Sequence, residues 1–189
     1  MADEKPKIFQ GGKDMVLSVG VIVLVMFLMV GFTGMCSWNP GAPKQGPVQE
    51  VDAVTFASLE ARTMNFPVRM PETPEGWVTN SARRSMVDDT PAVTIGWVTT
   101  EGGYLQLTQT GEELDDAVRG IDPDPRTLEE TREIAGEEVQ RYSSEESDVR
   151  DLWVVDLDEV RILLTGAGTD EEFSTLLDVA IEAEPLPSE

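Results

Sequence analysis

An uninterrupted apolar stretch near the start of this sequence limits what the chain can fold into. Residues Met15 to Met35 contain no charged side chain, and Ser18 and Thr33 lie near the two ends of the stretch. As a helix rising about 1.5 Å per residue, these 21 residues span roughly the 30 Å hydrocarbon core of a bilayer. A buried core helix is the alternative, but in a small domain such a helix is shorter and carries a polar stripe. The stretch therefore predicts one transmembrane helix over residues 15–35.

Charges on either side of the stretch predict its orientation. Lys5, Lys7 and Lys13 precede it, whereas Lys44 is the one lysine in the comparable segment that follows. Cytoplasmic flanks of membrane helices are enriched in Lys and Arg, so residues 1–14 are predicted to be cytoplasmic. The rest of the chain is then an extracytoplasmic region, anchored by a single pass through the plasma membrane.

Two residues just after the stretch, Trp38 and Cys36, are candidate functional positions. Trp38 suits the bilayer interface or a partner, because an indole ring can be half buried there with its N–H in water. A cleaved signal peptide is a competing interpretation of the apolar stretch, but the apolar run of a signal peptide is usually only roughly 7 to 15 residues long. Cys36 is a possible lipidation site, although Met35 stands where a lipoprotein signal needs a small residue. A free thiol or a reversible palmitoyl site remain the alternatives for Cys36.

The negative charge of the chain lies beyond the apolar stretch. The formal net charge is −22, and the residues after Met35 hold 33 acidic against 11 basic side chains. Such a region repels phosphate backbones and anionic headgroups, so no nucleic acid is expected as a partner. A basic protein face or divalent cations are better candidate partners. The alternative is that the negative charge only keeps an exposed domain soluble.

The side chains that carry most catalysis near neutral pH are missing. Histidine is absent and Cys36 is the single cysteine. This excludes a Ser-His-Asp triad, a Cys-His dyad, the usual zinc sites and an intramolecular disulfide. We therefore expect no enzymatic activity, no cofactor and no metal site of these kinds.

Proline and glycine mark the borders of a single domain. Residues 36–50 carry three prolines and two glycines, which is typical of an extended, semi-rigid spacer. Residues 51–184 have the length of one domain with its own core, and residues 185–189 are predicted to be a short disordered tail.

Short helices and strands alternate within this domain, with helices predicted over residues 51–62, 112–119 and 170–181 and strands over 77–86, 93–99, 104–109, 132–135, 137–142, 152–156 and 160–165. The second and third strands are joined by Glu101-Gly102-Gly103, which predicts a hairpin. The fold class is α+β, with a mainly antiparallel sheet and helices on one face. Both halves run from strands to a helix, so two strand-strand-strand-helix repeats are one interpretation and two independent units the other.

The last helix has the clearest local signal. Thr169 and Glu172 have the spacing of a capping box, in which each side chain satisfies an unpaired backbone N–H of the first turn. The apolar residues of the helix follow at helical spacing: Phe173, Leu176, Leu177, Ala180 and Ile181. One side of the helix is therefore expected to pack on the sheet and the other to be acidic.

Two short motifs in the domain could bind a ligand. Gly166-Ala167-Gly168 lies between a strand and a helix, as phosphate-binding glycines do, but the third glycine is missing and acidic residues follow. A plain helix-cap turn is the favoured interpretation. Asp122 and Asp124 could share a calcium ion with Glu129 or Glu130, although the neighbouring prolines favour a rigid linker.

Arg83 and Arg84 form the one pair of adjacent positive charges in the domain. They are candidate partner-binding residues, since guanidinium groups bind carboxylates through paired hydrogen bonds. The simpler interpretation is that they neutralise neighbouring acidic residues.

Several stretches resemble a known family: Lys13-Asp14-Met15, Gly34-Met35-Cys36-Ser37, Asn39-Pro40-Gly41, Phe66-Pro67-Val68, Pro74-Glu75-Gly76-Trp77 and Asn80-Ser81-Ala82-Arg83-Arg84. The chain resembles, over nearly its whole length, an actinobacterial family of membrane-anchored proteins whose extracytoplasmic domain has no assigned function. The resemblance implies the topology described above and supplies no catalytic residues.

In size and layout the chain is also similar to single-span accessory subunits of the actinobacterial cytochrome bc and cytochrome oxidase supercomplex, without a shared motif. That similarity implies a helix at the edge of the complex. It also implies an acidic domain over the outer face, near basic or haem-bearing surfaces of its neighbours.

The sequence favours a non-catalytic accessory or scaffolding subunit of a larger membrane protein complex. Its partners would be the lipid bilayer and other integral membrane proteins, with respiratory complex subunits among the candidates. A free-standing cell-envelope module that binds a small ligand or a cation is the alternative, and a hydrolase that uses acidic residues is a distant third.

Overall fold

The computed structural model describes the backbone of residues 10–33 and 48–188. In the first of these parts it also describes the side chains of residues 12, 13 and 15–29. The chain divides into two compact units, residues 1–46 and 47–189, and each is described by itself. Trp38 and Cys36 lie outside the described residues, as does most of the predicted spacer.

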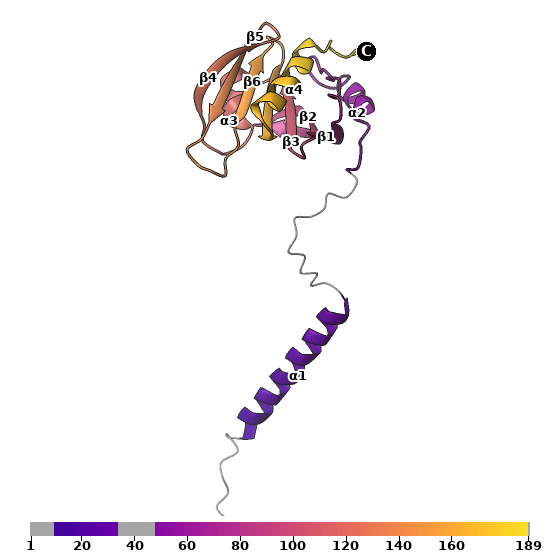
Figure 1. The fold of residues 1–189 in the computed structure, drawn as a ribbon, viewed down its shortest axis with the longest axis vertical. Coiled ribbons are helices and arrows are strands. Elements are labelled where there is room, and N and C mark those ends of the chain that lie inside the picture. The colour runs from indigo at the N-terminus through magenta and orange to yellow at the C-terminus, as the bar shows by residue number, and fades with distance from the viewer. Residues whose placement is uncertain (1–9, 34–47, 189) are drawn as a thin grey trace, which may run out of the picture. The chain divides into compact units, whose positions relative to one another are not determined.

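The described part of the first unit is the helix α1 (Gln10–Thr33), drawn in indigo in Figure 1. Every described side chain from Met15 to Met29 is exposed. Among the residues that the structure describes, no helix is both long and apolar enough to cross a membrane. Residues 30–35 of the predicted membrane span lie outside the described side chains.

The second unit is built on one antiparallel sheet of seven strands, in the order β1-β2-β3-β7-β6-β5-β4. The strands are β1 (Val78–Val87), β2 (Thr90–Val98), β3 (Tyr104–Thr110), β4 (Thr127–Ile134), β5 (Glu137–Ser143), β6 (Leu152–Asp156) and β7 (Arg161–Ala167). Three helices accompany them: α2 (Ala53–Glu60), α3 (Leu114–Gly120) and α4 (Asp170–Glu182). The α+β class, the antiparallel sheet and the predicted hairpin of β2 and β3 are confirmed.

The helices cover both faces of the sheet, so the prediction of helices on one face is wrong. Buried residues of α2 and α4 pack with Ile95 and Trp97 in the larger core. Ala117 of α3 packs on the opposite face, against Leu152 and Val154 in a smaller core. Figure 1 shows α4 in front of the strands and α3 behind them. Side chains alternate between the faces of a strand, so residues 152–155 of β6 and 162–164 of β7, which are buried, supply apolar side chains to both cores.

The two halves of the domain do not form a simple duplication. The strand order is mirrored about the β3–β7 pair, and each of these strands leads to a helix. Because β3 and β7 are antiparallel neighbours, a two-fold axis between them would be perpendicular to the sheet and keep both helices on one face. Since α3 and α4 lie on opposite faces, the interpretation as two equivalent strand-strand-strand-helix repeats is wrong.

The C-terminal residues are part of the domain, and the predicted disordered tail is wrong for residues 185–188. Pro185 forms a β-bridge with Arg69, and the amide of Leu186 donates to the carbonyl of Val68 at 2.8 Å. The Arg69 guanidinium also donates to the carbonyls of Ile181 and Ala183 at the end of α4. The apolar side chain of Leu186, which packs against the core, adds a reason for the tail to stay on the domain.

A buried glutamine holds this same segment to the sheet. The Gln109 side chain is fully buried and accepts from the Arg69 amide at 2.8 Å, while its Nε2 donates to the Arg69 carbonyl at 2.7 Å. The two bonds imitate those between neighbouring strands. Residues near Arg69 are thus fixed to β3 without forming a strand of the sheet.

Replacing Gln109 by leucine should lower the free energy of unfolding by at least about 2 kcal/mol. The change preserves volume but leaves two backbone groups without partners, and each buried unpaired group costs about 1–3 kcal/mol. Urea denaturation followed by intrinsic fluorescence measures the loss. Gln140→Leu, at a half-exposed position of β5, is the control and should change stability by less than about 1 kcal/mol. Equal effects of the two changes would contradict this role of Gln109.

Candidate functional site

Helix α4 is fixed at its first turn by the predicted capping box. The Glu172 amide donates to the Thr169 hydroxyl at 3.2 Å, and the Thr169 amide donates to the Glu172 carboxylate at 2.7 Å. Phe173, Leu176, Leu177 and Ala180 are buried, as their spacing predicted. The other side of the helix is exposed, so the acidic side chains on it can contact other molecules.

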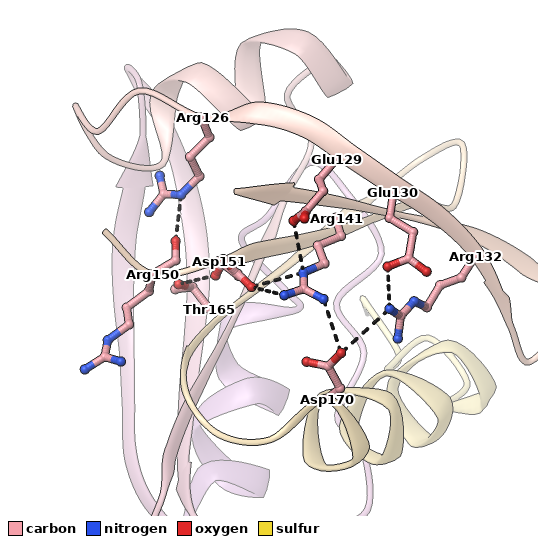
Figure 2. A network of polar contacts seen from close by, with 9 residues as sticks. All are labelled: Arg126, Glu129, Glu130, Arg132, Arg141, Arg150, Asp151, Thr165 and Asp170. Atoms are coloured by element: carbon pink, nitrogen blue, oxygen red, sulfur yellow. Dashed lines mark hydrogen bonds and ion pairs between the residues drawn. The ribbon is translucent and has the colours of Figure 1, made fainter. Parts of the chain in front are cut away.

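A network of arginines and acids ties the start of α4 to the strands β4 and β5. Arg141 of β5 contacts Asp151 at 2.6 Å and Asp170 of α4 at 3.2 Å. Arg132 of β4 contacts Glu130 at 2.7 Å and lies 3.8 Å from the same Asp170. Figure 2 shows both guanidinium groups reaching toward Asp170 from the two strands. Burial acts to lower the pKa of Arg141, but the hydrogen bond and the charge of Asp151, with Asp170 and Glu129, raise it above its ordinary value.

Trp153 lies beneath this network and joins it to the core. The carbon of the Arg132 guanidinium lies 4.2 Å from the centre of the Trp153 ring, and that of Arg141 lies at 5.8 Å. On the core side, the ring of Phe173 packs at 5.2 Å between centroids. A cation over an indole face is attracted by the negative side of the ring's quadrupole, so the network is stabilised by Trp153 as well as by the acids.

The positive charges of the domain are almost all used internally. Ten arginines and no lysine follow Lys44. Arg69 contacts the carbonyls that end α4, and Arg83 contacts Gln106. Six arginines pair with carboxylates: Arg84, Arg119, Arg126, Arg132, Arg141 and Arg161. The surface that remains for other molecules is therefore strongly acidic.

Unpaired acidic residues gather along one side of α4. Glu171, Thr175, Val179 and Glu182 lie on this side, at intervals of three or four residues. Beside the first half of α4 is an open hollow of about 590 Å³, and beside the second half is another of about 340 Å³. We call this surface the acidic flank and define it by the acidic residues that line the two hollows: Glu72, Glu75, Glu101, Glu171, Glu172, Glu182 and Glu184.

The acidic flank also has half-buried apolar residues and no basic residue. Trp77 and Pro74 line the first hollow, and Met70 and Val179 line the second. Trp77, Met70 and Val179 pack against the core, which holds them in place. Both hollows are open to solvent, and neither encloses a chamber for a substrate. This arrangement suits a surface that binds a protein carrying basic and apolar side chains.

The predicted partner-binding pair is not brought together. Arg83 and Arg84 are neighbours on β1 and point to opposite faces of the sheet, as successive residues of a strand do. Arg83 donates to Gln106 at 2.6 Å, and Arg84 pairs with Glu60 at 2.6 Å. They cannot hold one carboxylate together. The interpretation as a neutralising charge fits Arg84, whereas Arg83 contacts an uncharged amide.

The two motifs considered for ligands have structural partners. Asp122 accepts two hydrogen bonds from the buried guanidinium of Arg126, at 2.6 and 3.1 Å, which occupies both carboxylate oxygens. Gly166-Ala167-Gly168 leads into the capping box of α4, as the interpretation of these glycines as a plain helix-cap turn predicted. Within the described residues, no three His, Cys, Asp or Glu side chains are arranged to hold a metal ion.

Sequence reasoning found the acidic side of α4 but missed the second wall of the acidic flank. The helical spacing of Glu171 and Glu182 was visible in the sequence. The residues Glu72, Glu75 and Trp77 are about a hundred positions earlier, and no local pattern links them to α4.

Glu172→Gln should reduce stability at neutral pH by about 0.5–1 kcal/mol, because glutamine keeps the capping box but its uncharged amide oxygen accepts weaker hydrogen bonds than the carboxylate does. Burial acts to raise the pKa of Glu172, but hydrogen bonds from Thr99 and from the backbone and side chain of Thr169 outweigh it and lower the pKa below 4.5. Between the folded and unfolded pKa values the unfolded chain binds more protons. The stabilisation is therefore complete above pH 4.5 and is lost as the pH falls through the folded value.

The difference between wild type and Glu172→Gln should accordingly shrink as the pH falls below 4.5, which denaturant titrations at a series of pH values would measure. Glu171→Gln is the matched control on the exposed neighbour and should show little difference at any pH. A gap that stays constant with pH would contradict the role of the Glu172 carboxylate.

The comparisons with known proteins give a family and no function. No curated protein and no solved structure matches the chain. One family matches residues 7–180, and its description is protein of unknown function, DUF4245. Because the match covers most of the 189 residues, the chain belongs to the DUF4245 family.

Proposed function

We propose that this chain is a non-catalytic accessory or scaffolding subunit of a larger membrane protein complex, which docks on a partner through the acidic flank. The observation that carries the proposal is the charge distribution of the domain. Eight of its ten arginines have partners within the domain, while seven acidic side chains and the apolar Trp77, Met70 and Val179 border α4. Electrostatic complementarity then selects a partner with a basic surface.

The proposal includes a membrane anchor. Its support is the uncharged stretch from Met15 to Met35, with lysines concentrated before it. Exposed apolar side chains on all sides of α1 need an apolar environment, which a bilayer or a neighbouring membrane helix provides. The N-terminus is placed in the cytoplasm by its lysines and the acidic domain on the outer side of the plasma membrane.

The first partners to look for are subunits of a cytochrome bc and cytochrome oxidase supercomplex, because the chain is similar in size and layout to the accessory subunits of that assembly. Basic patches on their outer surfaces would meet the acidic flank. Trp38, near the predicted exit from the bilayer, is a proposed contact with the interface or with a partner. Cys36 is a proposed site of lipid attachment.

Purification of the full chain in mild detergent, followed by mass spectrometry of the proteins recovered with it, tests the proposed function. A membrane complex recovered in stoichiometric yield supports it. Recovery of the chain alone under low salt would contradict it and favour the free-standing module that binds a small ligand or a cation. Low salt matters because contacts between exposed charges weaken as ionic strength rises.

A further inference from the structure

We propose that the partner segment which occupies the acidic flank is a basic amphipathic α-helix, lying in one groove along α4. The inference deepens the docking proposed above and rests on it. The groove consists of the two hollows of the acidic flank, and four of its properties lead to this occupant: its length, its division into apolar and acidic parts, its lack of free backbone groups and its charge.

The two hollows follow each other along α4, between the same two walls. One wall is the exposed side of α4 from Glu171 to Glu182, a length of about 16 Å. The other wall is segment 70–77. Its residues 74, 75 and 77 line the first hollow, and its residues 70 and 72 line the second. The segment therefore runs along the whole exposed side of α4, and the two hollows form one groove.

Across its width, the groove has an apolar floor and an acidic rim. The floor consists of half-buried side chains, which are those of Met70, Pro74, Trp77 and Val179. Six of the seven glutamates of the rim are exposed, and Glu172 is the exception. A complementary segment carries a stripe of apolar side chains with lysine or arginine beside it. This is the pattern of a basic amphipathic helix.

The groove offers few backbone groups to a partner. Segment 70–77 is not a strand, and its residues Pro71 and Pro74 have no N–H. The Trp77 amide donates to the Pro74 carbonyl at 3.1 Å, and the backbone of α4 is bonded within the helix. A partner strand would leave its own N–H and C=O groups unpaired along this groove. An α-helix satisfies its backbone internally, so the groove favours a helix.

Segment 70–77 is held in place from the core side. The Thr73 hydroxyl accepts from Nε1 of the buried Trp97 at 3.2 Å and lies 2.9 Å from the Thr79 hydroxyl. Met70 and Trp77 pack against the core. The groove is therefore formed before a partner arrives, and binding costs little ordering of this wall.

Charge argues against other occupants of the groove. Its seven glutamates repel nucleic acid and anionic lipid. A second copy of the domain would bring the same acidic flank, and eight of its ten arginines already have partners within the domain. The occupant is thus a helix of a different protein, which supplies the lysine or arginine side chains.

The test measures binding of fluorescent peptides to the full chain in a nonionic detergent at low salt, by fluorescence anisotropy. The probe is a peptide of about 15 residues, stapled as a helix, with leucines on one side and lysines beside them. A second peptide has the same charge but no staple and a central proline, which breaks the helix. Thr175→Arg places bulk and positive charge in the groove, and Ser147→Arg makes the same change in charge on an exposed loop as the matched control.

The helical peptide should bind at least about 10-fold more tightly than the proline peptide. Thr175→Arg should weaken its binding at least about 10-fold, and Ser147→Arg less than about 2-fold. Equal binding of the two peptides, or equal effects of the two substitutions, would overturn the inference. If the helical peptide does not bind while a membrane complex is recovered with the full chain, the inference fails and the proposed function stands. Recovery of the chain alone would contradict the proposed function itself.

Discussion

Trp153→Ala should lower the free energy of unfolding of the domain by about 3–5 kcal/mol, as truncation of a buried aromatic side chain does. Trp153 is 1% exposed and contacts Phe173 on the core side and Arg132 on the other. The change leaves a cavity and removes the ring beneath two guanidinium groups. Domains of this size are stable by only about 5–15 kcal/mol, so much of the stability would be lost.

The melting temperature of Trp153→Ala should fall by roughly 10–20 °C, which calorimetry or circular dichroism would measure. Trp153→Phe is the conservative control. It keeps an aromatic face for Arg132 and should lose less than half as much. A melting temperature for Trp153→Ala within roughly 2 °C of wild type would contradict the central place of Trp153 in this core.

Reversing three charges on the acidic flank should weaken the partner complex by about 3 kcal/mol, or roughly 100-fold in Kd. The triple variant is Glu72→Lys with Glu171→Lys and Glu182→Lys. All three side chains are exposed and make no ion pair in the described domain, so the fold should be preserved. Each change removes one attraction to a basic surface and adds one repulsion.

The matched control reverses three exposed glutamates elsewhere: Glu133→Lys, Glu137→Lys and Glu146→Lys. The net charge changes by the same amount in both variants. Co-purification of partners should be lost in the first variant and retained in the control, at equal expression and equal melting temperature. Equal loss in both would mean that total charge, and not the acidic flank, determines binding.

Elements with strong local signals were predictable from the sequence. The cap at Thr169 and the hairpin between β2 and β3 depend on residues within a few positions of one another. Strand β4 was predicted too short, because Glu129, Glu130 and Glu133 hide its pattern. Charged residues on an exposed edge strand protect it from pairing with other chains, and they weaken the alternation by which strands are predicted.

The placement of helices on both faces was not predictable from periodicity. Residues 152–155 and 162–164 are buried on both faces, so their sequence is a continuous apolar run that does not show which side a helix covers. The separation of Arg83 from Arg84, in contrast, follows directly from the two-residue period of a strand. The acidic flank required tertiary structure, because its two walls are far apart in sequence.

Zero-length cross-linking with a carbodiimide tests the central claim, the docking of the acidic flank on a basic partner, most directly. The reagent joins a carboxylate to a primary amine with loss of water, and the chain has no lysine after Lys44. A link from the domain to a co-purifying protein therefore uses one of its own carboxylates and an amine of the partner. We predict linked peptides that contain Glu72, Glu75, Glu171 or Glu182. Links confined to other carboxylates, such as those of Glu133, Glu137 and Glu146, would contradict the account.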